Sequence, residues 1–127
     1  MELTKAEEQV MQYLWRIEKG FLKDIVEQFP QPRPAYTTVS TVIRVLVKKG
    51  FIGYTTYGKI HEYYPKVGKN EYLRYQLKGV VRNYFSDSLK KFASFFTKDD
   101  DLSLTELEEI RQIVDEQIKK QKNGNNE

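Results

Sequence analysis

The stretch AYTTVSTVIRVLVKKG, residues 35–50, constrains the fold more than any other part of the chain. Its apolar residues recur with the spacing of a helix face that packs against a core: Val39, Val42, Ile43, Leu46 and Val47. Hydroxyl and cationic side chains share that period on the opposite face, namely Thr37, Ser40, Thr41, Arg44 and Lys48. No carboxylate interrupts the stretch. The pattern therefore predicts an amphipathic helix whose polar face suits the edge of a nucleic acid.

Prolines and a glycine bound this helix. Pro32 and Pro34 each disfavour helical backbone at the residue before them, and Gly50 stands where a left-handed C-terminal cap is expected. Taken alone, an amphipathic helix is more often simply a packed helix than one that binds DNA. The neighbouring elements therefore decide between these two interpretations.

The residues before this stretch predict two further helices. Thr4 and Glu7 have the spacing of a capping box, so a helix should begin there. Its broad apolar face includes Trp15, which is expected to anchor the core. Residues 21–29 can form a short second helix that Pro30 ends. Three helices, the last of them amphipathic, follow the helix-turn-helix order, in which the last helix reads the major groove.

A β-hairpin is predicted directly after the amphipathic helix. Two β-favouring runs, residues 51–57 and 60–65, flank a turn made of Gly58 and Lys59. A basic hairpin at this place is typical of a winged helix, with Lys59 at the tip over the phosphate backbone. Tyr57 either assists in that contact or packs within its strand.

Positive charge is concentrated around these two elements. Between residues 33 and 69 the single acid Glu62 stands against seven cations, which are Arg33, Arg44, Lys48, Lys49, Lys59, Lys66 and Lys69. A local excess of this kind is the electrostatic footprint of a surface that binds a polyanion such as double-stranded DNA. A basic face that is merely solvated is the alternative.

From residue 70 onward the sequence predicts three more helices. They cover residues 71–85, a shorter stretch that ends at residue 96, and a last helix capped by Ser103 and Glu106. Three short helices cannot bury so many apolar side chains in a monomer, so dimerisation is expected. The side chains expected in the dimer interface are Leu77, Val81, Tyr84, Phe85, Leu89, Phe92, Phe96, Leu107, Ile110 and Val114. The polar end KKQKNGNNE has no apolar pattern, and a disordered tail is expected over residues 123–127.

Composition argues against several classes of protein. The chain has no cysteine and a single histidine, His61, so we expect no disulfide, no metal site and no cofactor. His61 stands alone in a predicted strand and is expected to be packed or at the surface. No nucleophile is paired with a base, so no catalytic residues and no enzyme are expected. No run approaches the roughly 18 apolar residues of a membrane span, and we expect a cytoplasmic protein without membrane insertion.

Four segments carry a resemblance to a known family: LTKAEEQVMQYLW, RPAYTTVSTVIRVLVKKGFI, the hairpin ending in YYP, and DLSLTELEEI. Over residues 3 to about 118 the chain resembles the penicillinase repressor family, of the BlaI, MecI and CopY type. The resemblance implies a mainly α fold with a small β-wing. It implies a winged helix-turn-helix domain over residues 1–69 and a three-helix dimerisation domain over residues 70–122. It further implies a transcriptional repressor that binds palindromic double-stranded operator DNA as a homodimer.

The resemblance also implies which residues bind DNA. The recognition-helix positions that touch operator DNA in the family fall on Thr37, Thr38, Ser40 and Thr41, with Arg44 one turn later. Some relatives have basic residues where this chain has Thr37 and Ser40. This departure shifts the expected contacts toward Arg44, Thr41 and the wing.

Relief of repression in the beta-lactam branch of the family follows proteolysis in the dimerisation domain, set off by a membrane-bound zinc-peptidase sensor. The corresponding bond here lies between Phe95 and Phe96. Staphylococcal members typically have asparagine before that bond, where this chain has Phe95, so cleavage at this position is a hypothesis. The copper-responsive branch carries a C-terminal cysteine cluster, and this cysteine-free chain has no ligands for that mode of sensing.

Two other interpretations stay open. A ligand-responsive winged-helix dimer would be regulated by a small molecule that enters the aromatic-rich dimer region. A winged helix used only as a protein-interaction module would carry its basic face incidentally. Its binding would then lack the steep salt dependence that phosphate neutralisation produces.

Overall fold

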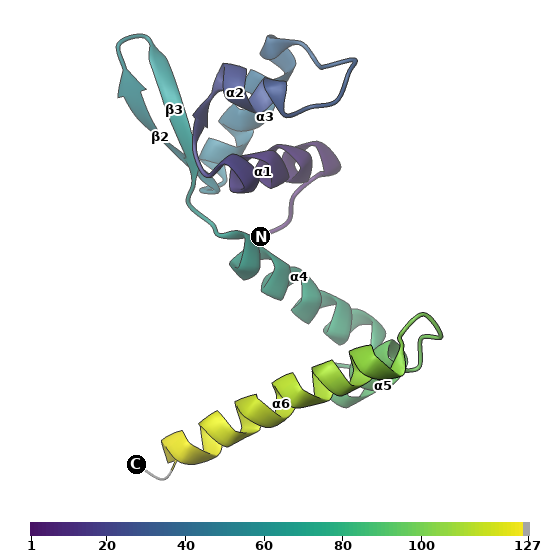
Figure 1. Cartoon of the computed structure of the whole chain (residues 1–127). Coiled ribbons are helices and arrows are strands. Elements are labelled where there is room, and N and C mark those ends of the chain that lie inside the picture. Colours follow the sequence, from purple (N-terminus) through teal and green to yellow (C-terminus); the bar gives the residue numbers. More distant parts are fainter. Residues whose placement is uncertain (126–127) are drawn as a thin grey trace. The chain divides into compact units, whose positions relative to one another are not determined.

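The computed structural model describes residues 1–125, which contain six helices and three strands (Figure 1). Along the chain these are α1 Lys5–Ile17, β1 Gly20–Phe21, α2 Leu22–Glu27, α3 Tyr36–Lys48, β2 Ile52–Tyr57, β3 Ile60–Pro65, α4 Lys69–Tyr84, α5 Leu89–Thr97 and α6 Leu104–Asn125. They form two compact units, the first over Met1–Leu77 and the second from Lys78 onward. The predicted mainly α fold with a small β-wing is confirmed.

Helix α1 begins with the predicted capping box. Thr4 Oγ1 accepts a hydrogen bond from the Glu7 N–H at 3.2 Å, and Glu7 Oε1 accepts one from the Thr4 N–H at 2.9 Å. These bonds satisfy N–H groups that have no partner within the helix. The carboxylate of Glu7 is therefore held in a defined place at the start of the fold.

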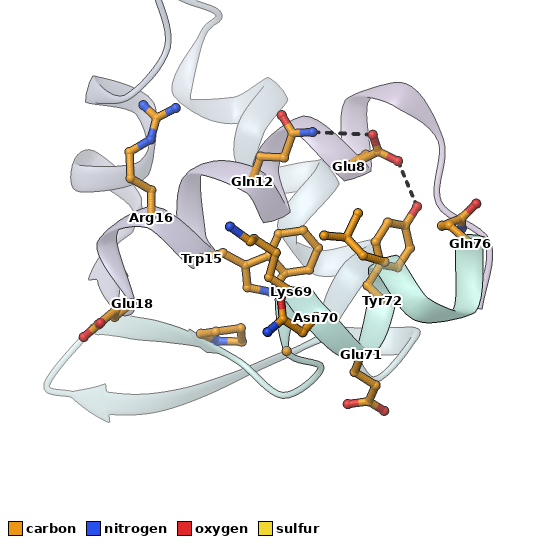
Figure 2. A pocket seen from close by; sticks show the side chains of 13 residues that line it. Glu8, Gln12, Trp15, Arg16, Glu18, Lys69, Asn70, Glu71, Tyr72 and Gln76 are labelled. Carbon is orange, nitrogen blue, oxygen red and sulfur yellow. Dashed lines mark hydrogen bonds between the residues drawn. The ribbon is translucent and has the colours of Figure 1, made fainter. Parts of the chain in front are cut away.

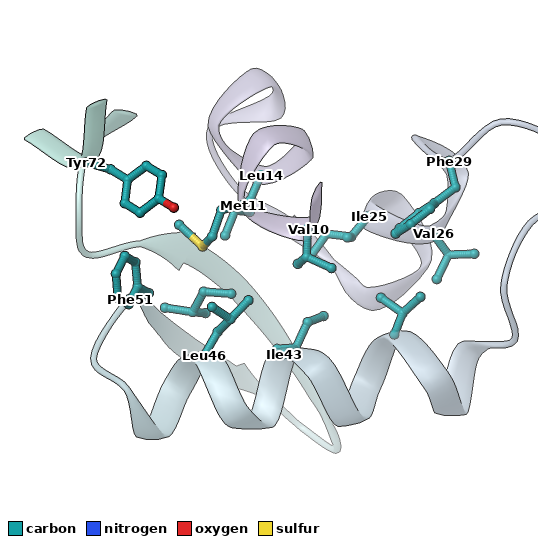
Figure 3. Packing of buried hydrophobic residues seen from close by; sticks show 12 residues of the cluster. Val10, Met11, Leu14, Ile25, Val26, Phe29, Ile43, Leu46, Phe51 and Tyr72 are labelled. Carbon is teal, nitrogen blue, oxygen red and sulfur yellow. The ribbon is translucent and has the colours of Figure 1, made fainter. Parts of the chain in front are cut away.

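The core of the first unit lies between α1, α2, α3 and the root of the hairpin (Figure 3). Its most deeply buried large side chains are Val10, Met11, Leu14, Ile25, Val39, Ile43, Leu46 and Ile52. Full burial of a side chain of this size stabilises the fold by about 1.5–3 kcal/mol. Trp15 lies partly buried against this core, and its indole N–H donates to the Val67 carbonyl at 2.9 Å. The predicted apolar face of α3 is thus confirmed as the face that packs.

The sheet of the first unit is antiparallel, with strand order β1-β3-β2. Strand β1 was not predicted, and α2 starts later and ends earlier than the predicted helix over residues 21–29. Gly20 pairs with Tyr63 of β3, and the Phe21 N–H donates to Asp24 Oδ2 at 2.9 Å, which starts α2 one residue further on. The difference arises because this two-residue strand depends on a partner distant in the sequence.

A Schellman motif ends α3. Gly50 takes the left-handed backbone conformation, with φ of 83°. Its N–H donates to the Val47 carbonyl at 3.1 Å, and the Phe51 N–H donates to the Leu46 carbonyl at 2.9 Å. This is the hydrogen-bond pattern of a glycine C-terminal cap. The predicted cap at Gly50 is confirmed, and it directs the chain into β2.

The first turns of α4 belong to the first unit. Tyr72 is only 3% exposed, and its ring packs against Trp15 and Phe51 with centroid distances of 5.6 and 6.0 Å. Its hydroxyl donates to Glu8 Oε2 at 2.8 Å beside an open hollow between α1 and α4 (Figure 2). The first unit therefore reaches Leu77, further than the boundary expected at residue 69.

The second unit contains the rest of α4 together with α5 and α6. The predicted capping box at the start of α6 is present, because the Ser103 N–H donates to Glu106 Oε1 at 3.0 Å and the Glu106 N–H donates to Ser103 Oγ at 3.1 Å. The structure differs from the expected disordered tail over residues 123–127, since α6 continues to Asn125. Asn123, Gly124 and Asn125 are all poor helix formers, so local propensity does not explain this extension. Residues 126–127 lie outside the described part of the chain.

Candidate nucleic-acid interface

The polar face of α3 is turned away from the core. Four of the residues predicted to bind DNA are exposed there, namely Thr37, Thr41, Arg44 and Lys48, and Ser40 is half-buried. Thr38 is exposed as well, but it lines a separate hollow beside Val39, Val42 and the start of α1. On the opposite face Val39, Ile43 and Leu46 are at most 2% exposed. The predicted division of this helix into two faces is confirmed, and the contact of these residues with DNA stays a prediction.

A groove separates α3 from the hairpin. Its lining includes Ser40, Thr41, Arg44 and Lys48 from α3, and Tyr54, His61 and Tyr63 from β2 and β3. Hydroxyls, aromatic rings and two cations therefore face the same open space. The last three residues were not predicted to belong to the site, because the strand pattern alone does not say which face of a hairpin turns toward the helix.

The hydroxyl of Thr41 is already used as a donor. Its Oγ1 donates to the Thr37 carbonyl at 2.9 Å, one turn earlier in α3. The oxygen keeps free lone pairs, so Thr41 presents an acceptor and a methyl group to the surroundings. An acceptor suits the amino groups of adenine and cytosine, and a methyl group suits the thymine methyl.

The tip of the hairpin places Lys59 in solvent. Gly58 has φ of 62°, which the primed two-residue turns require at their first position, and Tyr57 and Ile60 pair across that turn. Tyr57 packs edge-on against Phe21 at 6.1 Å between centroids, yet 53% of its surface is exposed. Tyr57 therefore packs within the first unit and also keeps exposed surface for contact with the phosphate backbone of DNA.

Aromatic rings lie against one another on the groove side of the hairpin. The rings of Tyr54 and His61 lie 4.3 Å apart between centroids, and Thr56 Oγ1 lies 3.0 Å from His61 Nδ1. His61 is therefore packed within the wing, one of the two places expected for it. Burial raises the pKa of Tyr63, Tyr54 adds to that rise, and the Arg44 guanidinium opposes it. The Tyr63 hydroxyl consequently stays protonated in the groove at neutral pH.

Two of the seven cations counted in the basic region are engaged inside the fold. Arg33 donates from Nε to the Phe29 carbonyl and from a terminal nitrogen to the Glu27 carbonyl, both at 3.0 Å, and so closes the end of α2. Lys49 Nζ lies 2.7 Å from Glu7 Oε1. Bonds to carbonyl groups leave the charge of Arg33 in place, whereas the Glu7 carboxylate neutralises Lys49, so the positive charge available to a ligand is smaller than the sequence count suggests by one.

The sequence matches a known protein family over most of its length. The family model described as "Penicillinase repressor" matches residues 3–116. The chain belongs to the penicillinase repressor family. The resemblance noted in the sequence is thereby confirmed over nearly the whole chain.

Relatives within the penicillinase repressor family match along almost their full length. The methicillin resistance regulatory protein MecI of Mammaliicoccus sciuri is 29% identical over 114 residues, which cover 89% of this chain and 93% of the relative. The penicillinase repressor of Bacillus licheniformis is 21% identical over 122 residues, which cover 95% of each chain. The solution structure of the DNA-binding domain of the repressor BlaI has a TM-score of 0.49 at 21% identity, covering 56% of this chain and 88% of that domain.

Within residues 1–125, no group of three or more histidine, aspartate or glutamate side chains is arranged to hold a metal ion. No helix in the described part of the chain has both the length and the apolar character that a membrane crossing needs.

Proposed function

We propose that this chain is a DNA-binding transcriptional repressor that places α3 in the major groove and lays the wing along the phosphate backbone. The observation that carries the proposal is the division of α3 into a buried apolar face and an exposed face of hydroxyls and cations. Membership of the penicillinase repressor family supports it. Repression then follows from occupancy of the operator alone, so the mechanism needs no catalytic group.

The exposed side chains have separate roles in this proposal. Arg44 lies on the middle of α3, where a planar guanidinium can bind a guanine edge through two hydrogen bonds. Lys48, one turn further along, and Lys59 at the wing tip neutralise phosphates and so supply affinity without sequence preference. Thr41 adds an acceptor and a methyl group for base edges.

We propose further that two chains form a homodimer through the second unit and the α4 residues next to it. Half of the side chains predicted for the interface are exposed in the single chain, namely Leu77, Tyr84, Leu89, Phe96 and Val114. The other half are buried or half-buried within the chain, namely Val81, Phe85, Phe92, Leu107 and Ile110. Exposed apolar surface of this extent marks an interaction site. A dimer axis would place two α3 helices on half-sites of a palindrome, one or two turns of about 34 Å apart.

Light scattering after size exclusion tests the homodimer. The wild-type chain is expected at twice its 15.1 kDa mass. Leu89→Asp is expected to give a monomer, because a carboxylate would be buried without a partner. Leu104→Asp is a matched control, since Leu104 is 73% exposed but lies outside the predicted interface. A wild-type monomer at the concentrations that repress would contradict the homodimer.

We propose as well that proteolysis between Phe95 and Phe96 by a membrane-bound zinc-peptidase sensor relieves repression. Phe95 is 70% exposed in the single chain and is not among the residues predicted for the dimer interface, so the residue before the bond is accessible to a peptidase. Mass spectrometry of the chain recovered from induced cells tests the proposal. A fragment that ends at Phe95 is expected, and an intact chain in fully induced cells would contradict it.

Footprinting tests the repressor itself. The chain is expected to protect a palindrome in the DNA upstream of its own gene and to reduce transcription from that DNA in vitro. A chain that protects no defined segment, or leaves transcription unchanged while bound, is not a repressor of this gene.

A further inference from the structure

We propose that Glu7 and Lys49 are a positioning pair, which sets the orientation of α3 for sequence-specific binding without either residue touching DNA. This inference rests on the proposed function as a DNA-binding repressor. Lys49 thereby has a different role from its neighbour Lys48, although the sequence gives both as consecutive cations at the end of the same helix.

The pair has a defined geometry. One oxygen, Glu7 Oε1, accepts from Lys49 Nζ at 2.7 Å and from the Thr4 N–H at 2.9 Å. Since Thr4 is the N-cap of α1, the carboxylate that receives Lys49 is itself fixed to the start of that helix. The Glu7 side chain is only 7% exposed, whereas the Lys49 side chain is 38% exposed. The lysine therefore reaches inward from the surface to a buried acceptor.

The electrostatics favour a persistent bond. Burial by itself raises the pKa of Glu7, but the hydrogen bonds from Lys49 and Thr4 outweigh burial, and the pKa lies below its ordinary value. The carboxylate is thus charged at neutral pH. An exposed ion pair contributes little to a fold, but an ion pair with one buried partner is costly to break, because it leaves a buried charge uncompensated.

The pair acts on α3 beyond the residues proposed to read bases. Lys49 is the C-cap of α3, whereas Arg44 and Thr41 lie five and eight residues earlier in the chain. Eight residues correspond to about 12 Å, so a tilt of about 5° at Lys49 moves Thr41 by about 1 Å. A recognition site needs placement within about 0.5 Å, so control of the C-terminal end matters for base contacts.

Core packing holds the same helix. Val39, Ile43 and Leu46 are buried and Val42 and Val47 pack beside them, which determines the face of α3 that points inward. The bond between Lys49 and Glu7 adds a directional polar contact beyond these residues, from the end of α3 to α1. Lys48, by contrast, has no carboxylate within 4.0 Å among the residues that the structure describes, and it faces the groove.

The experiment compares five full-length variants, which are Lys49→Met, Glu7→Gln, the double variant that combines these two changes, Lys48→Met and Glu8→Gln. Fluorescence anisotropy measures their affinity for the footprinted operator and for scrambled DNA of equal length over a range of salt concentrations, at a temperature where circular dichroism shows each variant folded. Lys48→Met is the phosphate-contact control. Glu8→Gln is the matched control for Glu7→Gln, because Glu8 binds Tyr72 of α4 and not α3.

We expect Lys49→Met to lower the preference for operator over scrambled DNA about tenfold, equivalent to about 1.4 kcal/mol, with an unchanged salt slope. Glu7→Gln should produce a smaller loss in the same direction, because its amide oxygen still accepts from Lys49 and no buried charge is left, and the double variant should lose no more than Lys49→Met, because both changes act on one interaction. Lys48→Met should weaken both DNAs by a similar factor and reduce the salt slope by about one. Glu8→Gln should leave the preference unchanged.

Two results would overturn the inference. If Lys49→Met weakened both DNAs alike and reduced the salt slope, Lys49 would be a phosphate contact. If it lowered the melting temperature but left preference and slope unchanged, the pair would serve stability alone. A wild-type chain without any preference for operator is a separate outcome, because it would refute the proposed function before any variant is compared.

Discussion

The hydroxyl of Tyr72 donates a 2.8 Å hydrogen bond to the carboxylate of Glu8, one residue after the glutamate that holds Lys49. Two consecutive carboxylates on the first turns of α1 therefore contact two different helices. Glu7 binds the end of α3, and Glu8 binds the beginning of α4. The start of α1 is thus a junction on which both the recognition helix and α4 depend.

Removal of the Tyr72 hydroxyl tests the α4 side of this junction. Tyr72→Phe keeps the ring against Trp15 and Phe51 but deletes the bond to Glu8. A hydrogen bond to a charged group contributes about 1.5–3 kcal/mol, so urea unfolding at neutral pH should show a loss of that order. An unchanged midpoint would mean that water replaces the bond without cost.

The same residue predicts a change of stability in alkali. Burial, and after it the bond to Glu8, raises the pKa of Tyr72 to about 12 in the folded chain. An unfolded tyrosine ionises near pH 10, so the stabilising contribution of Tyr72 is complete below about pH 10 and is lost as the pH rises through about 12. Unfolding free energies measured between these limits should fall more steeply for the wild type than for Tyr72→Phe. Parallel curves would contradict the assignment.

Gly50→Ala tests the cap of the recognition helix. The left-handed conformation at Gly50, with φ of 83°, is strained for alanine although no atom lies within 4 Å of the added Cβ. The expected loss of unfolding free energy is about 1–2 kcal/mol. Gly68→Ala is the control, because that position is equally open and has no left-handed φ. Equal stability of the two variants would contradict a role for Gly50 in the cap.

Arg44→Ala tests direct readout of bases. If Arg44 binds a guanine through both terminal nitrogens, operator affinity should fall by about 1–3 kcal/mol and discrimination should relax at one base pair. A binding series with each operator position substituted in turn locates that pair. An equal loss on every sequence would instead make Arg44 a phosphate contact.

Local patterns in the sequence predicted most of the elements. The two faces of α3, the capping boxes at Thr4 and Ser103 and the glycine cap at Gly50 all depend on residues within a few positions of one another. The hairpin likewise follows from two β-favouring runs around Gly58. These patterns involve only residues that are close together in the sequence, so they can be interpreted without a structure.

Features that need a distant partner could not be predicted. Strand β1 exists because Gly20 meets Tyr63, and Lys49 is neutralised because its ammonium group meets the carboxylate of Glu7, far away in the sequence. A count of charges treats Lys48 and Lys49 alike, and only their surroundings distinguish them. For the same reason, the sequence did not predict that Tyr54, His61 and Tyr63 line the groove, because this depends on which face of the hairpin packs toward α3.

The most direct test of the central claim is the salt dependence of binding to the DNA upstream of the protein's own gene, compared with scrambled DNA of equal length. The account predicts a preference of at least about a thousandfold, with the logarithm of the affinity falling linearly with the logarithm of the salt concentration. Binding that is weak, flat in salt and indifferent to sequence would contradict it, and the exposed face of α3 would then have to serve another partner.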